Sequence, residues 1–80
     1  MMPTVFTVQG FRFFFYSNEN NEPMHVHVEK GNATGKIWLE TEIKVVYMYG
    51  FSSGEERQIM QIVANKIQIV KQKWNEYFTK

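Results

Sequence analysis

The last third of the chain carries apolar residues at helical spacing, and this stripe constrains the fold more than any other feature. At 100° per residue, six of its side chains fall on one narrow face: Ile59, Val63, Ile67, Val70, Trp74 and Tyr77. Ser53, followed three residues later by Glu56, predicts a capping box at the start of the helix. One amphipathic helix cannot bury its stripe alone, so the rest of the chain must supply an apolar surface.

The preceding residues supply that surface as runs of β-branched and aromatic residues, separated by turn residues. Gln9-Gly10 and Gly31-Asn32 predict tight turns, and the polar segment 17–23 predicts a loop. The predicted strands are Thr4–Val8, Phe11–Tyr16, Met24–Lys30, Ala33–Glu40 and, as an edge strand or an irregular bridge, Ile43–Tyr49. We therefore expect an α+β fold in a single domain, residues 1–80. It is an antiparallel β-meander of four or five strands with one long C-terminal helix packed across one face.

Strand parity divides the side chains between two faces, because successive residues of a strand point in opposite directions. The more apolar parity should face the helix: Phe11, Phe13, Phe15, Val26, Val28, Ile37 and Leu39. The other parity should share the uncovered face: Arg12, Phe14, Tyr16, His25, His27, Glu29, Lys36, Trp38 and Glu40. Both histidines of the chain belong to this exposed group, which makes it the candidate site.

Composition limits the classes of function. The 80 residues contain no cysteine, which excludes disulfides and thiolate metal sites. The net charge of +1 means that nucleic-acid binding would depend on a local basic patch. No apolar run approaches the roughly 20 residues that span a bilayer, and the first residues do not resemble a secretory signal. We expect a cytoplasmic protein without a membrane partner.

Two interpretations of the histidine pair involve no catalysis. In the first, His25 and His27 are surface residues that form hydrogen bonds with their neighbours. In the second, His25, His27 and Glu29 bind a divalent transition metal such as Zn²⁺, for which imidazole and carboxylate are common ligands. A fourth protein ligand is not evident from the sequence.

The third interpretation is acid–base cleavage of RNA. One neutral and one protonated imidazole, on His25 and His27, could act as general base and general acid, since histidine titrates near physiological pH. The substrate-binding residues would be Arg12 and Lys36 for the phosphate and Tyr16 and Trp38, with Phe14, for stacked bases.

The same aromatic face could instead bind a protein partner. On the helix, Ile62 and Ile69 lie outside the apolar stripe and suggest a second contact strip, for another helix or for a further copy of the chain. A chain of this size buries only about 60% of its unfolded surface, so self-association could contribute to its stability.

Seven separated blocks of the sequence resemble a known bacterial family. They are PTVF at 3–6, the Gly10 turn, FFFYSNE at 13–19, EPMHVHVEKG at 22–31, KIWLE at 36–40, YGFS at 49–52 and KWNEYF at 73–78. The family is a domain of unknown function, catalogued as four-one-six-zero. The resemblance implies a small cytosolic protein encoded beside another small domain, in an arrangement that looks like a toxin–antitoxin pair. It carries over no catalytic residue, and Met24 stands where members often have proline.

Overall fold

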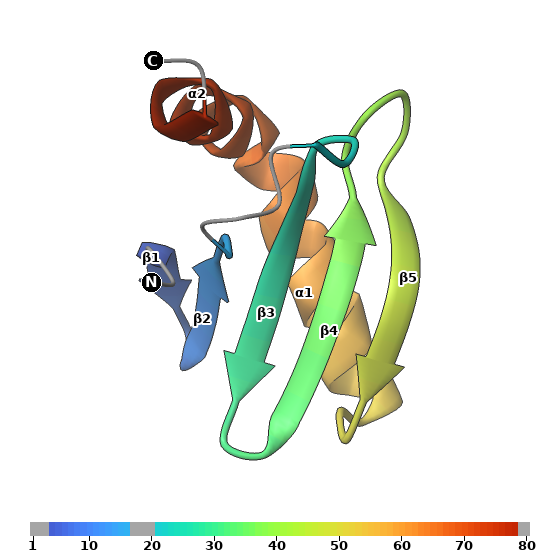
Figure 1. Cartoon of the computed structure of the whole chain (residues 1–80). Helices are drawn as coiled ribbons and strands as arrows, with labels where there is room; N and C mark the ends of the chain where they lie inside the picture. The colour runs from blue at the N-terminus through green and yellow to red at the C-terminus, as the bar shows by residue number, and fades with distance from the viewer. Residues whose placement is uncertain (1–3, 17–20, 79–80) are drawn as a thin grey trace.

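The computed structural model, which describes residues 4–16 and 21–78, is a five-stranded antiparallel sheet followed by two helices (Figure 1). The elements are β1 (Thr4–Val8), β2 (Phe11–Phe14), β3 (His25–Lys30), β4 (Ala33–Trp38), β5 (Lys44–Tyr49), α1 (Ser53–Asn65) and α2 (Ile67–Phe78). The strands lie in chain order across the sheet, so the predicted meander is confirmed and its fifth run is an edge strand. Part of the predicted polar loop, 17–20, lies outside the described residues.

The two predicted tight turns set the register within two hairpins, β1 with β2 and β3 with β4. Gln9 and Gly10 both have positive φ, 54° and 85°, as a two-residue type I′ hairpin turn requires. Gly31 has a φ of 60° at the turn between β3 and β4. Because both loops are short, each pair of strands has one register, and that register decides which side chains share a face.

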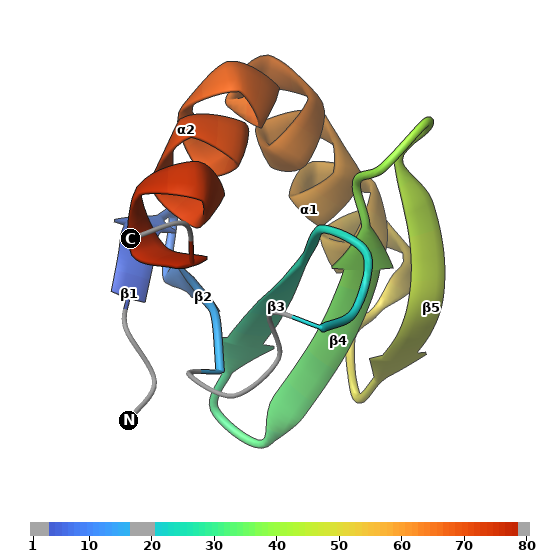
Figure 2. The ribbon, with the colours of Figure 1, turned by 45° about the horizontal axis from the view of Figure 1, so that its top comes forward.

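The C-terminal helix is divided in two, which differs from the single helix that we expected. Lys66 ends α1 with φ −112° and ψ 20°, and its backbone N–H donates to the Ile62 carbonyl. The chain then continues as α2 at a different angle (Figures 1 and 2). In Figure 1, α1 crosses behind the middle of the sheet, whereas α2 turns toward the end where β2 finishes and β3 begins. Among the described residues, neither helix is long and apolar enough to cross a membrane.

The face predicted to meet the helices forms the core. Its side chains are at most 2% exposed: Phe11, Phe13, Phe15, Val26, Val28, Ile37 and Leu39. Ile59, Val63, Val70 and Trp74 cover them from the helices. The placement of Ile62 outside the stripe was wrong, because it is only 8% exposed and packs in this core. Because the helix breaks at Lys66, α1 and α2 turn different faces toward the sheet. Ile62 lies about one helical turn after Ile59 and therefore packs beside it in the core.

The capping box at the start of α1 lies one residue earlier than predicted. Ser52, not Ser53, is the N-cap, and its Oγ accepts from the backbone N–H of Glu55 at 3.1 Å. The Glu55 carboxylate accepts in return from the Ser52 backbone N–H at 2.9 Å. This backbone hydrogen bond, with a smaller contribution from nearby Lys30, lowers the pKa of Glu55.

Candidate functional site

The residues predicted to share the uncovered face do share it. In an antiparallel sheet, residues directly opposite each other point to the same side. The register pairs Arg12 with Glu29, Phe14 with His27, His27 with Lys36, and His25 with Trp38. Parity therefore assigned these seven residues to one face correctly, whereas Tyr16 and Glu40 lie beyond the ends of β2 and β4.

The exposure expected for the two histidines was wrong. His25 is 0% exposed and His27 is 3% exposed, so both imidazoles are buried. Neighbouring aromatic side chains cover them on a face that no helix crosses along most of its length. Phe14, on the same face, is 1% exposed for the same reason.

His25 is held between two tryptophans at the start of β3. Its ring centroid lies 5.4 Å from that of Trp38 on β4 and 5.1 Å from that of Trp74 on α2. Nδ1 of His25 lies 2.8 Å from the Pro23 carbonyl oxygen, which can only accept, so Nδ1 is the donor. The ring is thus oriented by one hydrogen bond and two aromatic contacts.

His27 continues this aromatic cluster toward β2. Its ring stacks on Phe14, with centroids 5.5 Å apart and planes at 23°, and meets the edge of Tyr16 at 4.5 Å. The rings of His25 and His27 are nearly perpendicular, with centroids 5.1 Å apart. The guanidinium of Arg12 lies 4.5 Å above Phe14 and closes the cluster at that end.

The two cations proposed for phosphate binding already contact carboxylates. Arg12 donates to Glu29 at 3.0 Å and to the Thr4 hydroxyl at 2.8 Å. Lys36 donates to Glu22 at 2.8 Å and also lies 4.6 Å above the Trp38 ring. A phosphate would have to displace a carboxylate at either position, so the face is less favourable to RNA than its composition suggests.

The structure does not assemble the predicted set of metal ligands. The Glu29 carboxylate, expected to join His25 and His27, instead accepts from Arg12. Within residues 4–16 and 21–78, no group of three or more His, Cys, Asp or Glu side chains could hold a metal ion. What the structure does bring together is the histidine pair and its aromatic neighbours.

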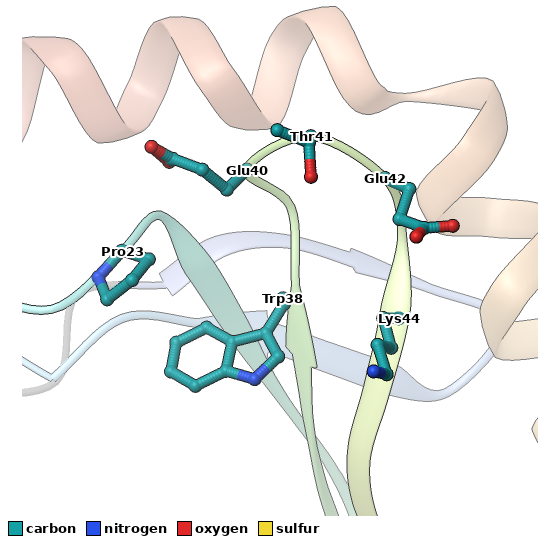
Figure 3. A pocket seen from close by; sticks show the side chains of 6 residues that line it. All are labelled: Pro23, Trp38, Glu40, Thr41, Glu42 and Lys44. Carbon is teal, nitrogen blue, oxygen red and sulfur yellow. The ribbon is translucent and has the colours of Figure 1, made fainter.

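A shallow pocket of about 300 Å³ opens beside Trp38, at the turn between β4 and β5 (Figure 3). It is lined by Pro23, Trp38, Glu40, Thr41, Glu42 and Lys44. Figure 3 shows the indole and Pro23 on one side and the polar turn above them. Sequence reasoning assigned only Trp38 and Glu40 to the candidate face. For the other residues that line the pocket, the available signal in the sequence was the run of polar residues that follows β4.

Tyr47 and Tyr49 on β5 also lie on this face, since they pair with Lys36 and Thr34. Their rings stack at 5.1 Å with planes at 18°, and Tyr49 is 65% exposed. Sequence reasoning missed both tyrosines, although their spacing of two residues was visible. The accessible part of the face is therefore an aromatic band, defined here as Tyr16, Trp38, Tyr47 and Tyr49.

Comparison with known proteins gives one match. The family model described as Domain of unknown function (DUF4160) matches residues 10–75, which include the histidine pair and the whole aromatic band. No curated protein and no solved structure matches the chain.

Proposed function

We infer the role of this chain from its site, because the chain belongs to the family described as Domain of unknown function (DUF4160), and that membership carries no activity. We propose that the chain is a non-enzymatic protein-interaction module. The observation that supports this proposal is the burial of His25 and His27, at 0% and 3% exposure. Because these two imidazoles are buried, they contribute to packing, and a partner would be bound by the exposed residues around them.

Burial of this kind disfavours acid–base catalysis. A general acid or base must come within hydrogen-bond reach of the atom that gains or loses the proton. His25 is enclosed by Trp38, Trp74 and the Pro23 carbonyl, so a substrate could reach it only if α2 or β4 moved. His27 would require displacement of Tyr16 or Phe14.

The aromatic band suits a protein partner. Tyrosine and tryptophan are enriched at interface hot spots, because each offers a large rigid surface with a polar tip. Tyr49 is well exposed, and Tyr16 is 37% exposed. Binding to RNA has less support, since Arg12 and Lys36 are engaged by carboxylates and the net charge is only +1.

The resemblance to this family suggests which partner to test. A small protein encoded by the adjacent gene, in a two-gene toxin–antitoxin-like module acting in the cytoplasm, is the partner that we propose. In such a module the chain would act by binding, and its toxicity or protection would depend on the complex. Ribonuclease activity by His25 and His27 is the alternative, and a bound transition metal is a further one.

The experiment measures binding of the purified chain to the product of the adjacent gene. Tyr49→Ala and Trp38→Ala should weaken binding by about 2 kcal/mol, or roughly thirtyfold, if these residues are hot spots. Gln68→Ala, which shortens an exposed polar side chain on α2, is the control and should leave affinity unchanged. If all three variants bind as the wild type does, or the wild type does not bind, the interaction proposal is wrong.

A parallel growth assay addresses the ribonuclease. The chain is expressed without its neighbour, both as wild type and as the double variant His25→Gln with His27→Gln, and urea unfolding confirms that the variant folds. If the wild type arrests growth and the folded double variant does not, the histidines are catalytic. The interaction proposal predicts the same growth for both.

A further inference from the structure

The two edges of the sheet differ in what they expose. On β1 the exposed side chains are Thr4 and Thr7, which are polar. On β5 they include Val45 and Val46, each 41% exposed, and Tyr49 at 65%. Edge strands usually carry charges, proline or bulges that prevent pairing with another chain. Both edges of this sheet have a register shift, and Lys44, at the start of β5, is the charged residue of that strand.

From this difference we propose that β5 pairs in antiparallel orientation with β5 of a second copy of the chain, so that the two sheets join into one. This self-association goes beyond the proposed binding of a different protein and does not depend on it. The surface is the outer edge of β5, which is hydrogen-bonded to β4 on its inner side.

The side chains of β5 are compatible with pairing to themselves. An antiparallel pair related by a twofold axis perpendicular to the sheet places side chains of the same face opposite each other. Tyr47 and Tyr49 of both copies would then form one row on the open face, extending the stack that the two rings already make. The register shift in β5, where Ile37 pairs with Val45 and Lys36 with Tyr47, leaves Val46 as a bulge, so the regular part of the strand begins at Tyr47.

Charge favours a second copy in this orientation. Lys44 is the charged residue of β5, and the chain after β5 enters α1, whose first turn carries Glu55 and Glu56. In Figure 1, α1 begins beside the end of β5. Antiparallel pairing would direct Lys44 of each copy toward the acidic helix start of the other, whereas parallel pairing would place the two lysines side by side.

Sedimentation over a range of concentrations provides the main test. The wild type should approach twice the 9.5 kDa mass of one chain as its concentration rises. Val46→Lys should raise the dissociation constant at least about tenfold, since it adds like charges beside the twofold axis. Thr7→Lys on the other edge is the matched control and should associate as the wild type does. A wild type that stays monomeric, or a dimer indifferent to Val46→Lys, overturns the proposal.

Because the chain has no cysteine, single substitutions can locate the contact. Under mild oxidation, at least one of Val46→Cys, Tyr47→Cys and Met48→Cys should form a disulfide-linked dimer, since one of these positions lies at the axis. Thr7→Cys should remain monomeric. Equal cross-linking at Thr7, or none at any β5 position, would show that β5 is not the contact.

Discussion

His25 and Trp74 pack edge to face, with ring centroids 5.1 Å apart and planes at 61°, and so connect the first residue of β3 to α2. Strand parity assigns His25 to the face opposite the helices. The contact exists because α2 closes over the end of the sheet, where Phe15 also meets Trp74 at 5.2 Å. The histidine is thus part of the joint between sheet and helix, which explains its complete burial.

Removal of the Trp74 side chain should destabilise the protein strongly. Trp74 is 7% exposed and contacts His25, Phe15 and Phe78, so Trp74→Ala should cost about 3–5 kcal/mol in the free energy of unfolding. Urea denaturation measures this cost. Ile69→Ala, on the exposed side of the same helix, should change it by less than about 0.5 kcal/mol. A Trp74→Ala cost below about 1 kcal/mol would mean that α2 does not pack as described.

Gly35 and Gly54 should respond to alanine in opposite ways. A Cβ on Gly35 would lie 2.6 Å from Met48 Sδ and 3.2 Å from the Tyr47 carbonyl oxygen, so Gly35→Ala should cost about 1–3 kcal/mol. At Gly54, in the first turn of α1, the contact that a Cβ would meet is Ser52 Oγ at 3.9 Å. Gly54→Ala should therefore be neutral or up to about 1 kcal/mol more stable. Equal midpoints in thermal unfolding for the two variants would contradict the close approach of β4 and β5.

The capping box should make part of the stability depend on acid pH. The Ser52 backbone hydrogen bond lowers the pKa of Glu55, so its stabilisation is complete above the ordinary glutamate pKa of about 4.3. It is lost as the pH falls through the lowered value in the folded state. The difference in unfolding free energy between the wild type and Glu55→Gln should shrink over that range, and Glu42→Gln serves as the control. Parallel curves for the wild type and Glu55→Gln at every pH would exclude this role.

Metal binding should be weak or absent, because Glu29 is held by Arg12 and the histidines are covered. Calorimetric titration with Zn²⁺ near neutral pH should give no heat that depends on the two imidazoles. Saturable binding that disappears in the double variant His25→Ala with His27→Ala would restore the metal interpretation. Such binding should also weaken below about pH 6, where histidine protonates.

Much of the fold could be predicted from the sequence, because its turns are short and chemically specific. Gln9-Gly10 and Gly31-Asn32 fixed the hairpins, and alternation then assigned the faces of β2, β3 and β4 correctly. The division of the helix was missed, since Lys66 is an ordinary helix former and no proline or glycine marks the break.

The burial of His25 and His27 could not be predicted from strand parity. Parity gives the direction of a side chain and says nothing about what covers it. His27 is covered by Phe14 and Tyr16 from its own face, and His25 by a helix assigned to the other face. Both effects depend on ring sizes and on where α2 ends relative to the sheet.

Chemical modification of the two histidines tests the central claim most directly. Diethyl pyrocarbonate reacts with accessible imidazole, and mass spectrometry can locate the product at His25 or His27. If both rings are buried as described, modification of the native protein should be many times slower than that of the urea-unfolded chain. If either histidine in the folded protein reacts as fast as in the unfolded chain, the imidazoles are accessible, and the interaction module loses its main support.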